Sequence, residues 1–190
     1  MENDIVIVSS LRTPIGAFCG ALKTLTAPQL ASIVIKEIIQ QTAIDPKLID
    51  EVILGNVLSA GIGQAPARQA ALSADLDHST NCLTINKVCG SGLKAIMLAA
   101  DSIRCSNAEI MIAGGMESMS NAPFISTTHR HGNRLGNSVL LDSLIHDGLW
   151  DPYHHFHMGN AAEICAKTHH ISREDQDQFA ITSYERALSA

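Results

Sequence analysis

The sequence predicts an α/β fold, in which a parallel or mixed β-sheet is covered by helices on both faces. Two observations predict this class. Short, mostly apolar segments, typical of strands buried on both faces, lie at residues 5–9, 51–54, 82–86 and 110–113. Helical patterns are found among them, at residues 27–41, 66–73 and 93–103. Strands that alternate with helices favour parallel strand pairing, because a parallel pair needs a long crossover connection.

Each element has its own local signal. Residues 5–9 are apolar and rich in β-branched side chains, which predicts a buried strand. The helix at residues 27–41 carries an apolar stripe, formed by Leu30, Ile33, Val34 and Ile38. The helix at residues 93–103 is rich in helix formers, and one of its faces is formed by Leu93, Ile96, Met97, Ala100 and Ile103.

The character of the chain changes after Ser120. Residues 121–160 are rich in Gly, Asn, His and Pro, and only residues 138–145 show a short regular pattern. We therefore expect an α/β domain at residues 1–120 and a second domain at residues 121–190. Ser172 begins a capping-box pattern with acidic residues in the first turn of a final helix. That helix meets no stop signal before residue 190, a pattern that fits either a domain with a frayed end or a chain that is cut inside a larger protein.

Composition narrows the function classes. The formal net charge of −6 argues against general binding to nucleic acids or anionic membranes. No apolar stretch approaches the roughly 20 residues that span a bilayer. The five cysteines are odd in number and show no C-x-x-C spacing, so neither a disulfide framework nor a structural zinc site is expected. Reduced thiols of this kind favour a cytoplasmic protein.

Cys89 is the strongest candidate for chemistry. It lies between the predicted strand at 82–86 and the predicted helix at 93–103, and Gly90 and Gly92 would permit a sharp turn there. The first amides of the helix favour a thiolate at such a position. This arrangement resembles a nucleophile elbow with sulfur in place of the serine hydroxyl, which suggests covalent acyl transfer.

Two other interpretations of this segment stay open. Most lone intracellular cysteines are small buried core residues. In addition, residues 90–95 (GSGLKA) fit the G-x-G-x-x-A pattern of a dinucleotide-binding turn. That pattern also requires an acid at the carboxyl end of the next strand, whereas Glu109 precedes the strand at 110–113. The dinucleotide interpretation is therefore weak.

Several motifs resemble those of the thiolase family. The most specific are residues 86–92 (NKVCGSG), 113–120 (AGGMESMS) and 51–58 (EVILGNVL). Residues 12–16, 64–70 and 157–163 agree with the family in the same order. The resemblance covers essentially the whole chain and is strongest with the biosynthetic type. It implies a thiolase-like layered α/β fold with part of an inserted loop domain, and it makes Cys89 the acyl-accepting cysteine.

The resemblance also implies a reaction. Two acetyl-CoA molecules would condense to acetoacetyl-CoA and CoA, or the reverse, through an acetyl-Cys89 intermediate. The backbone N–H of Cys89 would be one of two oxyanion donors. The family's second cysteine, its Gly-His-Pro histidine and its Asn-Glu-Ala asparagine would lie outside these residues, so we expect this chain alone to be unable to complete turnover. No cofactor is implied, because the CoA thioester is the substrate.

Further residues are implicated by the same resemblance. It places Leu149, His157 and Met158 near the acyl and pantetheine end of the substrate. Each of them could instead serve only local packing. The cluster His154, His155 and His157 lacks a carboxylate or cysteine at ligand spacing, and no metal site is expected there. The basic residues His129, Arg130, His131 and Arg134 fall in the segment that joins thiolase subunits, which implies a homodimer or homotetramer; a solvated loop is the alternative.

Three alternative functions remain. A long-chain 3-ketoacyl-CoA thiolase shares these motifs. A β-ketoacyl synthase or hydroxymethylglutaryl-CoA synthase shares the acylated cysteine, although residues 114–119 (GGMESM) favour a thiolase over both. A non-catalytic thiolase-like module for binding or assembly would show ordinary thiol reactivity at Cys89.

Overall fold

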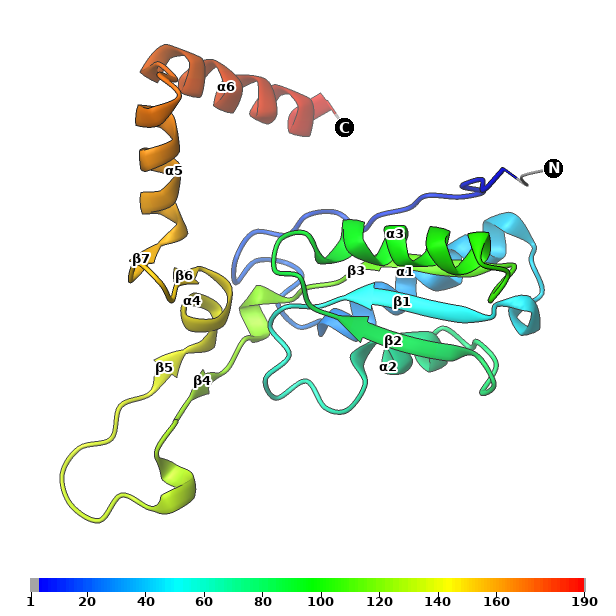
Figure 1. Ribbon diagram of the computed structural model, residues 1–190, viewed down its shortest axis with the longest axis horizontal. Helices are drawn as coiled ribbons and strands as arrows, with labels where there is room; N and C mark the ends of the chain where they lie inside the picture. Colours follow the sequence, from blue (N-terminus) through cyan, green and yellow to red (C-terminus); the bar gives the residue numbers. More distant parts are fainter. Residues whose placement is uncertain (1–3, 190) are drawn as a thin grey trace. The chain divides into compact units, whose positions relative to one another are not determined.

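The computed structural model describes residues 4–189 and falls into two compact units, Met1–Gly148 and Leu149–Ala190. The first unit is built on a three-stranded parallel sheet with the strand order β2-β1-β3 (Figure 1). The strands are β1 (Glu51–Gly55), β2 (Asn81–Ile85) and β3 (Met111–Gly115). In the central strand, Glu51 pairs with both Asn81 and Met111. The α/β class and these three strands were predicted, and the described sheet is parallel throughout.

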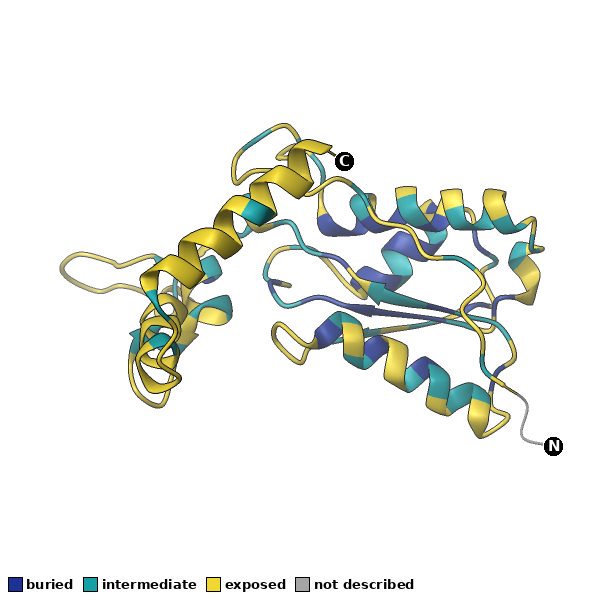
Figure 2. Ribbon diagram, turned by 90° about the horizontal axis from the view of Figure 1, so that it is seen from above, coloured by how far each residue is buried: buried dark blue, intermediate teal, exposed yellow. Residues whose placement is uncertain are grey.

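Helices cover both faces of this sheet. Figure 2 shows it edge-on, with helices on either side. Helices α1 (Ala27–Thr42) and α2 (Pro66–Ser73) pack on each other and on one face, and α3 (Ser91–Arg104) packs along β1 and β3 on the other. Val52 and Leu54 belong to the core cluster that α1 and α2 form, whereas the buried Ile53, which alternates with them along the strand, faces α3.

Local capping explains where α1 begins. The Thr26 hydroxyl accepts a hydrogen bond from the backbone N–H of Gln29, and the Gln29 side chain accepts one from the N–H of Thr26. This reciprocal pair is a capping box, which satisfies two amides that the first turn leaves free. The helix ends at Ala43, whose φ of 52° lies in the left-handed region.

The apolar stripe of α3 does not face the sheet. Its buried side consists of small residues, Ser91, Ala95 and Ala99. Leu93 and Met97 on the opposite side are 67% and 50% exposed. The reason is that the sheet presents glycines to this helix, so the two backbones approach too closely for large side chains.

The strand expected at residues 5–9 is absent from the described structure, and that prediction was wrong. This segment pairs with no strand in the described part of the chain, and Val6, Ile7 and Val8 are 70%, 78% and 69% exposed. β-branched composition favours a strand only where a neighbouring strand supplies hydrogen bonds and burial.

Residues 121–148 cluster with the first unit. Short strands β4 (Phe124–Ile125) and β5 (Leu141–Asp142) pair antiparallel, and α4 (Ser143–Gly148) follows. The described residues of this unit also form three 3-10 turns, at Pro46–Leu48, Met119–Asn121 and His129–His131. The two compact units divide after Gly148, and the domain boundary expected at residue 120 stays a prediction.

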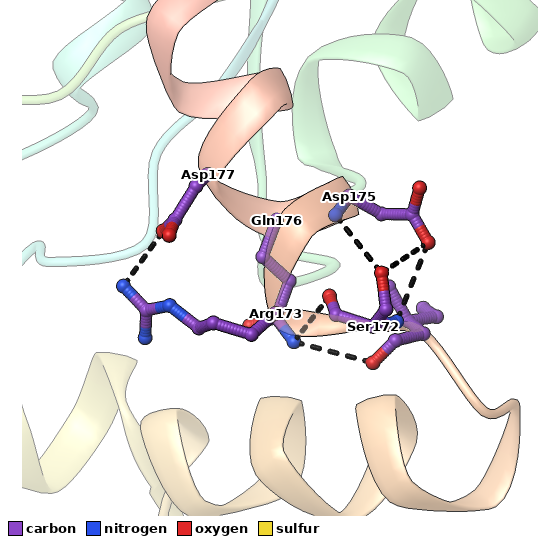
Figure 3. Close-up of polar contacts among 6 residues, drawn as sticks. Ser172, Arg173, Asp175, Gln176 and Asp177 are labelled. Atoms are coloured by element: carbon purple, nitrogen blue, oxygen red, sulfur yellow. Dashed lines mark hydrogen bonds and ion pairs between the residues drawn. The ribbon is translucent and has the colours of Figure 1, made fainter.

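The second unit contains a two-stranded ribbon and two helices. Its elements are β6 (Trp150–Asp151), β7 (Phe156–His157), α5 (Met158–Thr168) and α6 (Arg173–Ser189). The predicted capping box at the start of α6 is present: the Ser172 hydroxyl accepts from the N–H of Asp175, and the Asp175 carboxylate accepts from the backbone N–H of Ser172 (Figure 3). An ion pair between Arg173 and Asp177 follows. Among residues 4–189, no helix combines the length and the apolar character that crossing a membrane requires.

Candidate active site

Three loops meet at one edge of the sheet. Parallel strands end on the same side, so the segments that follow β1, β2 and β3 are neighbours there (Figure 1). The backbone N–H of Asn56, after β1, donates to Ile85 at the end of β2, and the N–H of Met116, after β3, donates to Gly55. Cys89 lies in the loop after β2 and is exposed. The sheet therefore presents the cysteine at the edge where α/β proteins bind their ligands.

The turn that carries Cys89 is held by its own residues. The Asn86 side chain accepts a hydrogen bond from the N–H of Val88 (2.8 Å). The Ser91 hydroxyl accepts from the N–H of Lys87 (2.8 Å) and donates to the carbonyl of Val88 (2.6 Å). Cys89 follows Val88 directly, so these contacts fix the backbone from which its thiol projects.

The structure corrects the expected role of the glycines in this turn. Gly90 has an ordinary φ of −89°, and the left-handed residue is Val88, with a φ of 47°. The glycine that the packing requires most strictly is Gly55, at the end of β1. A Cβ there would lie 2.5 Å from Cβ of Ser91 and 2.9 Å from the backbone N of Gly92. Gly55 thus lets the first turn of α3 lie directly on the sheet.

A half-buried carboxylate joins two of the three loops. Glu117 follows β3 and accepts hydrogen bonds from the Asn56 side chain (2.8 Å) and from the N–H groups of Val57 (2.8 Å) and Leu58 (3.2 Å). Burial raises the pKa of Glu117, and these hydrogen bonds oppose that shift. The carboxylate accepts only and faces only donors, so it acts as a brace between the loops after β1 and β3.

The same segment also holds an earlier loop. The Ser118 hydroxyl donates to the carbonyl of Leu25, and the side chain of Asn121 donates to the carbonyls of Lys23 and Leu25. The hydroxyl of Ser120 accepts from the N–H of Cys19. The polar residues of the motif at 113–120 therefore hold the surrounding loops in place at the edge of the sheet.

The predicted substrate residues lie together in the second unit. Leu149 accepts a hydrogen bond from the N–H of Met158 (2.8 Å), and Trp150 pairs with His157 across the ribbon. Nδ1 of His157 accepts from the N–H of Gly159 and caps α5. His157 thus has a structural task of its own, and the predicted contact of these three residues with a substrate stays a prediction.

Neither the metal nor the dinucleotide interpretation gains support. Across residues 4–189, no group of three or more His, Cys, Asp or Glu side chains is arranged to hold a metal ion. His154 pairs with Asp151 and stacks on Phe156 instead. Glu109 lies before β3, and its N–H donates to Asp50. The acid that follows β3 is Glu117, and its carboxylate already accepts hydrogen bonds from the N–H groups after β1.

An α/β domain with an exposed cysteine on a braced strand-to-helix turn defines a class that includes many acyl-transferring proteins. The particular family follows from comparison with known proteins. The sequence matches the family described as "Thiolase, N-terminal domain" over residues 5–190. The chain belongs to the thiolase family.

Proteins of similar sequence come from bacteria, fungi and animals. The chain is 52% identical over 188 residues to a "Probable acetyl-CoA acetyltransferase" of Escherichia coli (strain K12), covering 99% of this chain and 48% of that protein. It is 51% identical over its whole length to an "Acetyl-CoA acetyltransferase" of Schizosaccharomyces pombe, of which it covers 48%. It is 52% identical to "Acetyl-CoA acetyltransferase B, mitochondrial" of Xenopus laevis, covering 99% of this chain and 44% of that protein. The chain spans about half the length of these relatives.

Sequence reasoning singled out Cys89 as a candidate but missed the residues that hold the loops around it. The strained Val88 has no sequence signature, because a β-branched residue is among the least expected in the left-handed region. Asn86, two residues before Val88, is a weak signal, since asparagine side chains often accept from the N–H two residues on. The brace formed by Glu117 joins residues about 60 apart, and no local pattern indicates it.

Proposed function

We propose that this chain carries the nucleophile of a thiolase-type acyltransferase, with Cys89 as the residue that accepts the acetyl group. The observation that carries the proposal is the position of Cys89. Its thiol is exposed on a turn that hydrogen bonds from Asn86 and Ser91 hold in place, at the carboxyl edge of a parallel sheet. The names of the similar proteins supply the substrate class, acetyl-CoA.

The reaction proceeds in two stages. The Cys89 thiolate attacks the thioester carbonyl of acetyl-CoA; a carbon–sulfur bond to the enzyme forms, the bond to CoA breaks, and CoA leaves as a thiolate that takes up a proton. A second acetyl-CoA then loses a proton from the carbon next to its carbonyl. The resulting enolate attacks the acetyl group, which releases Cys89 and forms acetoacetyl-CoA.

This chain supplies the first stage. The N–H of Cys89 is proposed as one donor to the oxyanion that forms during the attack. The base for the second stage and the other oxyanion donor match no motif within residues 1–190, so we expect them outside this segment. Support for this view comes from the similar proteins, which are about twice as long as the chain.

Partners and location follow from the same proposal. The ligands are acetyl-CoA and acetoacetyl-CoA, and no resident cofactor is required, because the thioester is itself the activated group. A homo-oligomer is supported by apolar side chains around the basic segment: Leu135 and Val139 are 95% and 71% exposed. A cytoplasmic location stays an expectation, since the name of one similar protein says mitochondrial.

The test replaces Cys89 in the protein as the cell makes it. Cys89→Ala should lower the rate of acetoacetyl-CoA thiolysis by at least about 1,000-fold while the far-UV circular dichroism stays unchanged. Cys105→Ala, which removes an exposed thiol at the far end of α3, is the matched control and should retain activity. Full activity of the Cys89→Ala variant would refute the proposal and favour a non-catalytic module.

A further inference from the structure

The turn before α3 is strained at the residue next to the nucleophile. Val88 has a φ of 47°, in the left-handed region that β-branched residues rarely occupy. Its side chain is 52% exposed, so burial does little to hold it there. An exposed residue keeps such a conformation only when its surroundings impose it.

Two side chains impose it, one on each side of Val88. Asn86 binds the N–H of Val88, and Ser91 binds its carbonyl. Ser91 is only 5% exposed and lies in the first turn of α3 against Gly55, so its position is set by the sheet. Its hydroxyl also accepts from the N–H of Lys87. The Ser91 hydroxyl therefore ties two peptide groups of the turn, one before Lys87 and one after Val88, to the rigid part of the fold.

We propose that Ser91, assisted by Asn86, is a positioning residue for Cys89: its hydroxyl holds Val88 in the left-handed conformation and thereby fixes the direction of the thiol. This inference rests on the proposed role of Cys89 as the acetyl acceptor. Both hydrogen bonds of the Ser91 hydroxyl go to backbone groups, so it acts through the backbone and not as an acid or base.

The consequence for the reaction is a matter of alignment. Attack on a thioester requires the sulfur to lie close to the carbonyl carbon along a defined direction, and a displacement of about 1 Å can slow such a step about 100-fold. Loss of the Ser91 hydroxyl frees the N–H of Lys87 and leaves the carbonyl of Val88 with the backbone N–H of Ser91 as its remaining donor (3.1 Å). Val88 can then relax toward an ordinary conformation. Relaxation changes the direction of the Cys89 side chain without touching the thiol itself.

The experiment measures acetylation of Cys89 in the protein as the cell makes it. The reaction is quenched rapidly after mixing with acetyl-CoA and analysed by peptide mass spectrometry. This gives the limiting rate of acetylation and the half-saturating concentration, which is the acetyl-CoA concentration at which acetylation runs at half of that rate. Ser91→Ala should slow the limiting rate about 100-fold and leave the half-saturating concentration within about twofold. Ser102→Ala, on the same helix and without a side-chain hydrogen bond in the described structure, should match the unmodified protein.

Two further variants separate positioning from a loss of folding. Asn86→Ala acts on Val88 from the exposed side and should slow acetylation about tenfold. Val88→Gly removes the conformational penalty, so Ser91→Ala should cost much less in that background than in the unmodified protein. Equal losses in the two backgrounds, or a Ser91→Ala variant as fast as Ser102→Ala, would overturn the inference.

A separate readout keeps this inference distinguishable from the proposed function. Absence of acetyl-Cys89 in the unmodified protein would refute the proposed function. Alkylation by iodoacetamide then decides the positioning role, with the exposed Cys105 as an internal reference for folding. The ratio of the alkylation rates of Cys89 and Cys105 should change by about tenfold in Ser91→Ala; an unchanged ratio would refute the inference.

Discussion

At the scale of single residues, Glu117 shows how a charged side chain serves a site without taking part in chemistry. It braces the loops after β1 and β3 through hydrogen bonds from Asn56, Val57 and Leu58. Burial raises its pKa, and the N–H donors oppose that shift. The balance between desolvation and hydrogen bonding is therefore a measurable property of this residue.

Glu117→Gln tests that balance. Glutamine places an amide group against N–H donors, so the free energy of unfolding should fall by about 1–3 kcal/mol near neutral pH. Because the folded-state pKa of Glu117 is raised, its protonation stabilises the fold fully below the ordinary value of 4.5, and this contribution is lost as the pH rises through the raised value. The difference in the free energy of unfolding between the unmodified protein and Glu117→Gln should therefore become smaller as the pH rises above 4.5.

Urea unfolding at a series of pH values between about 4 and 8 measures this difference. Glu185→Gln on α6, where the carboxylate is exposed, is the control and should show no such trend. A difference that widens with rising pH would mean that the hydrogen bonds outweigh burial, and would contradict a raised pKa for Glu117.

At the scale of elements, the contact between α3 and the sheet determines the position of the candidate active site. Gly55 at the end of β1 lies under Ser91, and Gly115 at the end of β3 approaches the backbone of Gly92, where an added Cβ would lie 3.3 Å from its Cα. This close approach explains why α3 buries alanines and exposes its larger apolar residues. It also means that the position of the first turn, and of Cys89 before it, depends on the absence of side chains from the sheet.

Gly55→Ala should disturb both stability and reactivity. The added Cβ meets backbone atoms of the first turn of α3, which must shift, so unfolding should become easier by about 1–3 kcal/mol. Acetylation of Cys89 should slow because the turn moves with the helix. Thermal unfolding and the acetylation assay measure the two effects.

Gly114→Ala is the matched control for Gly55→Ala. The nearest neighbour of the added Cβ would be Cδ2 of Leu54 at 4.0 Å, so this substitution should cost less than about 1 kcal/mol. Equal behaviour of the two variants would contradict the close approach of α3 to the sheet as the cause.

The elements with complete local signals were predicted well. The capping box of α6, and the apolar run of β1 flanked by helical patterns, depend on neighbouring residues alone. The orientation of α3 was not predictable from its own sequence, because its larger apolar residues formed the obvious stripe. The deciding information lies in Gly55 and Gly115, on two different strands.

At the scale of the whole molecule, what could not be predicted depends on long-range contacts. Residues 5–9 have strand composition but no partner strand in the described structure. Cys89 could be singled out as the candidate nucleophile because its motif is local. The roles of Ser91 and Glu117 were not predictable, since they are defined by backbone conformation and by contacts between distant loops.

Acceptance of the acetyl group by Cys89 is the step on which the proposed function depends, and trapping that intermediate tests it most directly. The protein is mixed with radiolabelled acetyl-CoA, quenched in acid and digested, and the labelled peptide is sequenced by mass spectrometry. We predict one acetyl group per chain, bound to Cys89, and no label on the other four cysteines. An unlabelled Cys89, or label on Cys19, Cys82, Cys105 or Cys165 in its place, would contradict the proposed role of Cys89.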